Sequence, residues 1–225
     1  MARKKQTRGR CAYCGREMTR GGLARHLSTC PERQVRIAEA NKKRGRTEML
    51  YHLQVQDAWR GDYWLHLEMA GSTRFEDLDY YLRAIWLECC GHLSRFGGWG
   101  GPEIPMSVTL NRFLEPGLEL LHIYDFGTSS ETLVKVGAER EGKATTPHAV
   151  ALMARNDEPE MFCIECERPA RWLCIECLYE DEESGTLCDE HAESHPHDDY
   201  GEPMPLVNSP RVGMCGYSGP AEPPY

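Results

Sequence analysis

Two segments in the middle of the chain alternate between apolar and polar positions. They are residues 49–56, MLYHLQVQ, and residues 62–69, DYWLHLEM. Alternation with a period of two places every second side chain on one face of a β-strand. The pattern therefore predicts two strands joined by a turn at DAWRG, residues 57–61.

A helical repeat follows the second of these segments. Thr73 and Glu76 have the spacing of a capping box, which marks the start of a helix. Apolar side chains then recur at helical spacing, at Phe75, Leu78, Leu82, Ile85 and Cys89. One face of this helix is therefore expected to lie in the core, and the glycines of residues 92–101 are expected to end the helix.

Further short strands are predicted from four later apolar segments. These are residues 106–114 (MSVTLNRFL), 118–126 (LELLHIYDF), 130–136 (SETLVKV) and 148–154 (HAVALMA). Two strands, a packed helix and more strands indicate an α+β fold, with the helix on one face of the sheet.

The two ends of the chain carry opposite charge. Residues 1–50 hold 14 Lys or Arg and four Glu, whereas residues 156–202 hold 16 Asp or Glu and only two Arg. The formal net charge of the whole chain, −9, conceals this asymmetry. A basic end attracts phosphate backbones and an acidic end repels them, so the pattern favours an adaptor with two different partners.

Eleven cysteines raise the question of disulfides or metal. The N-terminus MARKKQTRGR is basic with no apolar segment behind it, and apolar runs such as AVALMA are too short to span a bilayer. We therefore expect a cytoplasmic protein without a membrane partner. In that compartment paired cysteines more often hold zinc than form disulfides.

Eight potential ligands lie between residues 161 and 197. A Cys-x2-Cys pair presents two thiolates at tetrahedral angles, and zinc takes four Cys or His ligands. Because seven residues separate the first two pairs, alternate pairing is the expected arrangement. One ion would take Cys163, Cys166, Cys188 and His191, and the other would take Cys174, Cys177, His195 and His197.

This order resembles the cross-brace of B-box zinc modules, which bind proteins. The ten residues 178–187 make a longer gap than B-boxes usually have, which leaves the pairing of the ligands open. Eight ligands saturate two ions with no position for water, so the expected role of the metal is structural. The alternative is a cysteine-rich loop without metal.

A second cluster lies in the basic arm. The spacing Cys11-x2-Cys14-x11-His26-x3-Cys30 resembles a zinc finger whose last His is replaced by Cys. On a helix that starts near Thr19, His26 and Cys30 lie one turn apart on the same face. The sequence thus predicts about three structural zinc ions per chain.

The arm is a candidate nucleic-acid interface. At the base-reading positions of the finger, Thr19, Gly22 and Arg25, only Arg25 offers a strong base contact. Contact with the phosphate backbone or with structured RNA is therefore expected, and the alternative is a solvated tail. The candidate residues are Arg3, Lys4, Lys5, Arg8, Arg10, Arg25, Lys42, Lys43, Arg44 and Arg46.

The middle of the chain resembles a known family. Three groups of residues carry the resemblance: Tyr51, Leu53 and Val55; His92, Leu93 and Phe96; and Tyr124, Asp125, Phe126 and Gly127. In this order they look like the Ri-plasmid ORF-three-like family, whose members are also described as insertion-element passenger proteins of the TnpR type. The C-terminal sequence PRVGMCGYSG, with Cys215, Gly216 and Tyr217, is similar to the Gly-rich turn of that family.

The resemblance covers residues 49–150 and 205–218 and implies a β-grasp-like α+β fold encoded by a mobile element. It implies no established activity. This chain departs from the family at Asp79, where the family has a helix His, and at Thr128 and Ser129. Four regions are therefore expected: a basic arm with one finger (1–47), the α+β core (48–155), an acidic B-box-like double-zinc module (156–202), and a segment that returns to the core (203–225).

Enzyme classes find little support in the residues. A serine recombinase needs an Arg cluster beside its nucleophilic Ser, and the core has no such cluster. The kinase-like Asp-Phe-Gly at Asp125 lacks the accompanying motifs, so Asp125 is expected to be a turn residue. We expect a non-enzymatic adaptor that contacts nucleic acid or a ribonucleoprotein through the finger, and protein through the core and the acidic module. The alternative is a small cytosolic hydrolase or transferase with a site near His122 and Asp125, to which His92 and Cys215 could contribute.

Overall fold

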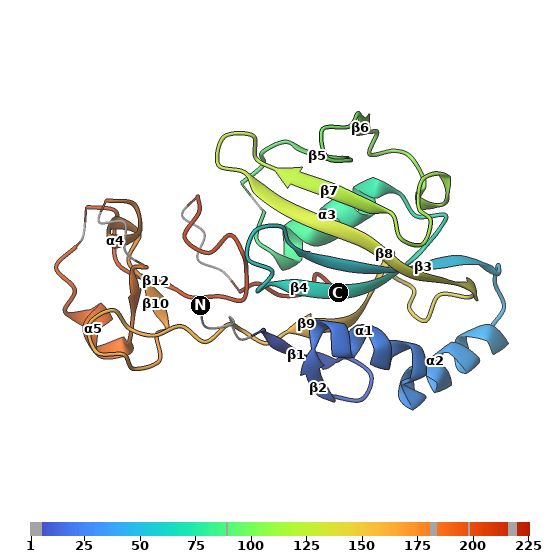
Figure 1. Cartoon of the computed structure of the whole chain (residues 1–225), viewed down its shortest axis with the longest axis horizontal. Coiled ribbons are helices and arrows are strands. Elements are labelled where there is room, and N and C mark those ends of the chain that lie inside the picture. The colour runs from blue at the N-terminus through green and yellow to red at the C-terminus, as the bar shows by residue number, and fades with distance from the viewer. Residues whose placement is uncertain (1–5, 89, 181–183, 198, 216–219) are drawn as a thin grey trace.

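The centre of the molecule is a nine-stranded antiparallel sheet. A computed structural model describes residues 6–88, 90–180, 184–197, 199–215 and 220–225. The strand order is β2-β1-β9-β4-β3-β8-β7-β5-β6 (Figure 1). The strands of this sheet are β1 (Arg8–Cys11), β2 (Glu17–Thr19), β3 (Glu48–Asp57), β4 (Trp64–Ala70), β5 (Ser94–Gly97), β6 (Glu103–Ile104), β7 (Glu119–Tyr124), β8 (Ser130–Gly142) and β9 (Val150–Asn156).

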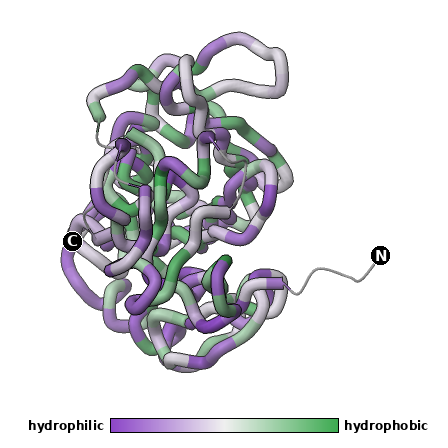
Figure 2. Tube along the Cα trace, turned by 90° about the vertical axis from the view of Figure 1, so that its left-hand side faces the viewer, coloured by the Kyte–Doolittle hydropathy of each residue, from purple (hydrophilic) through white to green (hydrophobic). Residues whose placement is uncertain are grey.

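The hairpin β3–β4 and the helix α3 (Phe75–Ile85) form the expected core. Strand β3 alternates between buried and half-buried residues along most of its length, as the sequence predicts, and it pairs with β4 from Leu50↔Ala70 to Gln56↔Trp64. Figure 2 shows hydrophobic and hydrophilic residues interspersed along the trace, as half-buried strands require. The buried face of α3 packs against Leu53, Val55 and their neighbours. The mixed helix and strand class is therefore confirmed, and the narrower β-grasp description stays a prediction.

Strand β4 is buried on both of its faces. Leu65, Leu67 and Met69 belong to the cluster beneath α3. Trp64 belongs instead to a second apolar cluster, formed with the N-terminal finger. The sequence predicted one covered face, and the finger provides the second cover.

Two predicted elements differ in the structure. The start of α3 lies one residue later than expected, because the backbone N–H of Arg74 donates to the carboxylate of Asp77 at 2.8 Å. Residues 106–114 form a turn and a single 3-10 helix η1 (Leu110–Arg112) in place of the predicted strand. Cys89, predicted on the core face of the helix, lies outside the described residues.

The reason for the missing strand lies at the start of α3. The carbonyls of Met106 and Val108 accept hydrogen bonds from the N–H groups of Glu76 and Phe75, at 3.0 and 3.2 Å. The first N–H groups of a helix have no partner within the helix. The segment satisfies these groups and so is not available to a sheet.

The N-terminal finger is joined to the core sheet. Its hairpin β1–β2 is followed by α1 (Arg20–Thr29) and α2 (Pro31–Lys42). Strand β1 pairs antiparallel with β9, from Gly9↔Asn156 to Cys11↔Ala154. The finger is therefore an extension of the sheet as well as a cover for β4.

The acidic module projects from the other side of the core (Figure 1). It has its own sheet of two-residue strands in the order β11-β10-β12, and two helices of five residues each. The elements are β10 (Trp172–Leu173), α4 (Ile175–Tyr179), β11 (Thr186–Leu187), α5 (Asp189–Glu193) and β12 (Met204–Pro205).

The chain after β12 packs against the core. The side chains of Asn208 and Asn156 bond at 2.7 Å, and the hydroxyl of Ser209 donates to the carbonyl of Trp86 at 2.7 Å. Arg211 is wholly buried among core residues. Within the described ranges, no helix is both long and apolar enough to cross a bilayer.

Candidate metal centres

The structure gathers twelve Cys and His side chains into three sets of four. Within each set, the candidate ligand atoms all lie within 4.8 Å of one another. The sets are Cys11, Cys14, His26 and Cys30; Cys163, Cys166, Cys188 and His191; and Cys174, Cys177, His195 and His197. Their geometry is compatible with metal binding.

The finger site is built by a hairpin and a helix. Cys11 is the last residue of β1 and Cys14 lies in the turn that follows, α1 carries His26, and Cys30 lies between α1 and α2. The hydroxyl of Thr19 caps α1 by accepting from the N–H of Gly22 at 3.3 Å. This cap fixes the start of the helix, and hence the position of His26 relative to the cysteines.

Distances in the finger site match a tetrahedral ion. Zn–S bonds of about 2.3 Å at tetrahedral angles separate two sulfur ligands by about 3.8 Å, and a sulfur from a nitrogen ligand by about 3.5 Å. The Sγ atoms of Cys11 and Cys30 are 3.9 Å apart, and Cys14 Sγ lies 3.2 Å from His26 Nε2. Burial raises the pKa of Cys30 to about 11, so metal binding at neutral pH displaces a proton from this thiol.

The first site of the acidic module has the same dimensions. Cys166 and Cys188 are 3.8 Å apart between their Sγ atoms, and His191 Nδ1 lies 3.3 Å from Cys163 Sγ and 3.6 Å from Cys188 Sγ. The guanidinium of Arg168 donates to Cys166 Sγ at 3.2 Å. This hydrogen bond lowers the pKa of Cys166 and so favours the thiolate that binds metal.

The second site of the module uses both histidines of the His-Pro-His sequence. Cys177 Sγ lies 3.2 Å from His195 Nε2 and 3.2 Å from His197 Nδ1, and Cys174 Sγ lies 3.8 Å from His197 Nδ1. The four pairs of ligands therefore alternate between the two sites along the chain, in the order of a cross-brace.

The candidate nucleic-acid residues fall into separate groups. The exposed residues are Arg25 on α1, Lys42 and Lys43 at the end of α2, and Arg44 and Arg46 just after it. Arg8 and Arg10 are also exposed, but each pairs with a carboxylate, Arg8 with Glu17, and Arg10 with Asp157 at 3.1 Å. Arg3, Lys4 and Lys5 lie outside the described residues.

His122 and Asp125, the two residues named for the candidate enzyme site, contact different sets of side chains in the structure. His122 is wholly buried and its Nε2 lies 2.8 Å from a carboxylate oxygen of Asp79. Burial alone would raise the pKa of Asp79, but hydrogen bonds from His122, Ser94 and Arg83 outweigh it and lower the pKa to about 2. Sequence reasoning missed this network, because its members come from α3, β5 and β7.

Asp125 lies instead in a turn. Its φ is 63°, and one carboxylate oxygen accepts from the N–H of Gly127 at 2.9 Å, so the predicted turn role is confirmed. The other oxygen lies 3.5 Å from His92 Nδ1. His92 in turn belongs to a fourth group of candidate ligands, with Cys90 and Cys215. The sequence proposed His92 and Cys215 together but did not include Cys90.

Comparisons with known proteins place few limits on these sites. A scan against models of protein families gave no match, and a search of curated proteins gave none. Among solved structures, the crystal structure of a protein of unknown function, MM3350 from Methanosarcina mazei Go1, matches 48% of this chain and 67% of its own. The two sequences are 18% identical over the match, and the TM-score is 0.39. A likeness at this level carries no inference about function.

Proposed function

We propose that the protein is a non-enzymatic adaptor held together by three structural zinc ions. The finger contacts nucleic acid or a ribonucleoprotein, and the core and acidic module contact protein. One observation carries the proposal: three complete sets of four Cys and His ligands lie in two regions of opposite charge. Four protein ligands leave no coordination position for a reacting water, which favours a structural role for each ion.

The end of α2 is the best-supported surface for phosphate contact. Lys42, Lys43, Arg44 and Arg46 are exposed there. In Figure 1 this end of α2 and the acidic module lie at opposite ends of the long axis. A phosphate backbone bound at α2 would therefore avoid repulsion by the module.

The acidic module is the proposed protein-binding surface. Phe162 and Tyr179 are exposed there among many carboxylates, and exposed aromatic residues are enriched in protein interfaces. The resemblance to the Ri-plasmid ORF-three-like family supports an origin in a mobile element. This origin and the expected cytoplasmic location both stay proposals.

Salt dependence tests the nucleic-acid contact. Affinity of the full chain for a labelled RNA or DNA duplex, measured by fluorescence anisotropy, should fall steeply as salt rises. Replacing Lys42 and Arg44 by Gln should reduce the salt slope by about two. The matched control, Arg112→Gln with Lys135→Gln, removes the same charge elsewhere and should leave the slope unchanged. Binding that is absent, or equally weakened by both pairs, would refute the contact.

Elemental analysis tests the zinc. Protein purified without chelator should contain close to three zinc ions per chain, and a value of one or less would refute the structural assignment. Co-purification after nuclease treatment would then identify any protein bound through the module. A partner lost on removal of residues 161–197 alone supports the proposed role of the module.

A further inference from the structure

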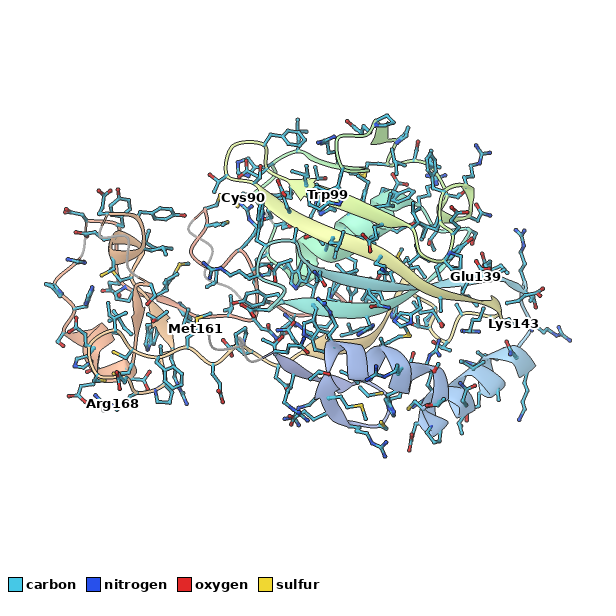
Figure 3. The ribbon with its side chains drawn as sticks, in the orientation of Figure 1. Cys90, Trp99, Glu139, Lys143, Met161 and Arg168 are labelled. Carbon is cyan, nitrogen blue, oxygen red and sulfur yellow. The ribbon has the colours of Figure 1, made fainter. Side chains whose placement is uncertain are left out.

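Three exposed side chains form a fourth cluster at one end of the core. Cys90 and His92 lie between α3 and β5, and Cys215 lies in the C-terminal segment. Their candidate ligand atoms lie within 4.8 Å of one another. Figure 3 labels Cys90 at the end of the core from which the zinc module projects. Residues distant in sequence thus meet with the ligand types that transition metals prefer.

The backbone around the cluster adopts conformations that are uncommon for its residues. Cys215 has a φ of 55° and Asp125 has a φ of 63°, both in the left-handed region. Residues other than Gly, Asn and Asp seldom adopt this region, so the strain falls on Cys215, and such strain is concentrated at functional sites. Between Cys90 and His92, Gly91 has a φ of 75° and adopts the left-handed region without strain.

A second layer of residues orients the three ligands. His92 Nδ1 faces the carboxylate of Asp125 at 3.5 Å, which leaves Nε2 as the ring nitrogen available to a metal. The backbone N–H of His92 donates to the hydroxyl of Tyr124 at 3.3 Å. Carboxylates that orient metal-binding histidines in this way are a regular feature of zinc sites.

Cys215 is oriented by a buried arginine. Arg211 NH2 lies 3.3 Å from Cys215 Sγ and 3.4 Å from the Asp125 carboxylate, while NH1 donates to Ser130 Oγ at 2.7 Å. The side chain of Arg211 is only 1% exposed. A fixed guanidinium that donates to sulfur holds the side chain of Cys215 in one orientation. One carboxylate and one guanidinium thus connect His92 to Cys215.

We propose that Cys90, His92 and Cys215 bind a fourth metal ion, zinc or another transition metal, and leave one coordination position open. Among the residues that the structure describes, the three other sets each have four ligands, whereas this set has three, and all three are exposed. Two Cys and one His with a fourth position filled by water is a ligand set found in catalytic zinc sites. The open position takes water or a small anion. The inference does not depend on the adaptor function.

Cobalt(II) distinguishes this site from the closed ones. Zinc is added, or withdrawn with a weak chelator, until the reduced full chain holds three ions, which occupy the closed sites because each of these offers one more protein ligand. The zinc content is measured, and cobalt, which nitrogen and sulfur ligands bind less tightly than zinc, is then added. One further equivalent of cobalt should bind, with the ultraviolet charge-transfer absorption of thiolate ligands. Azide should then shift the visible bands of the bound cobalt, because it enters the open position.

Variants assign the signal to the cluster. Cys90→Ser and Cys215→Ser should each remove about half of the charge-transfer absorption, and Asp125→Asn should lower cobalt affinity about 10-fold while keeping all three ligands. His148→Asn changes an exposed histidine outside the four sets and should have no effect. The zinc content of each variant should equal that of the parent, which shows that the closed sites and the fold are intact.

Three results would overturn the proposal. They are the absence of the extra equivalent of cobalt, a spectrum unchanged in Cys215→Ser, or a Cys90–Cys215 disulfide that persists under the reducing conditions. An extra equivalent that azide does not perturb would overturn the open position. Failure of the adaptor proposal would appear separately, as a zinc content of one or less before cobalt is added.

Discussion

The finger and the acidic module use the same ligand types in the same four-ligand arrangement, but they are attached to the protein in different ways. The finger shares strand β1 with the central sheet, and its Leu23 and Leu27 pack against Trp64 and Met153. The module has a separate sheet. Its buried cluster consists of four ligand cysteines and Leu187. Similar metal chemistry therefore serves one region that has apolar support from the core and another that has little.

A buried ion triad strengthens the attachment of the finger. Glu68 of β4 accepts from Arg33 of α2 at 2.6 Å and from Arg140 of β8 at 2.6 and 2.9 Å. The Glu68 side chain is 2% exposed. No comparable buried triad is found in the described part of the module. The comparison implies that metal loss should destabilise the acidic module more than the finger.

Metal removal should have the largest effect. Chelation should unfold residues 161–197 while β3, β4 and β8 stay folded, because structural zinc contributes roughly 10–16 kcal/mol in small modules with little core of their own. Hydrogen exchange followed by mass spectrometry would locate the unfolded segment. As a control, Cys174→Ser without chelator should expose the same segment. Simultaneous loss of protection in the core would contradict the separation.

Disrupting the Arg33–Glu68–Arg140 triad should have the next largest effect. Glu68→Gln should lower the free energy of unfolding by about 3–5 kcal/mol, because it leaves the buried guanidinium of Arg33 and the half-buried guanidinium of Arg140 without a counter-charge. Chemical denaturation would measure the loss. Glu119→Gln breaks an exposed pair with Lys135 and should cost far less. Equal losses in the two variants would show that the triad does not attach the finger.

Acid should weaken the junction between the finger and the core. His52 Nε2 and His66 Nδ1 are 2.8 Å apart, and burial lowers their pKa values to about 4 and about 3. The unfolded chain therefore binds protons first as the pH falls below about 6.5. Stability should be unaffected by these groups above that pH and should then fall towards pH 4, by at most about 1.4 kcal/mol per pH unit for each histidine.

The measurement is the free energy of unfolding between pH 4 and 7. Acid also releases metal, so the informative quantity is the difference between the parent and a variant with His52→Gln and His66→Gln. The double variant should show a shallower loss of stability, and His148→Gln should match the parent. An identical slope in all three proteins would refute the role of the pair.

Removing a helix cap should give the smallest effect. Thr19→Ala should lower the free energy of unfolding by about 1 kcal/mol, because the N–H of Gly22 loses its acceptor. Cobalt affinity of the finger should fall as well, since His26 is carried by the same helix. Thr29→Ala, at the other end of α1, is the matched control and should change that affinity less. A larger effect from Thr29 would show that the cap does not set the site.

Local patterns were enough to predict most of the core and all three four-ligand sets. The alternation in residues 49–56 and the helical spacing from Phe75 to Ile85 reflect burial on one face, which a sequence records directly. The wrong strand at 106–114 has apolar residues too, but the helix start uses its carbonyls. Such a competition is visible only in three dimensions.

Contacts between segments distant in the sequence were the other features that the sequence could not predict. The second cover of β4, the Arg33–Glu68–Arg140 triad and the meeting of Cys90 with Cys215 each join parts of the chain separated by many residues. A charged Glu68 between two apolar neighbours gives no sign in the sequence that it will be buried. Its partners, Arg33 and Arg140, can be identified only from the position of the finger on the sheet.

The pairing of β1 with β9 sets an order of events during synthesis. The finger leaves the ribosome before β9, yet β9, the partner of β1 in the central sheet, is complete only at Asn156. At 5–20 residues per second, the wait is on the order of ten seconds. Cys11, Cys14, His26 and Cys30 are all available from the beginning, so metal can close the finger while its docking surface is still being made. The nascent chain would thus carry a metal-closed finger before the sheet to which the finger docks has formed.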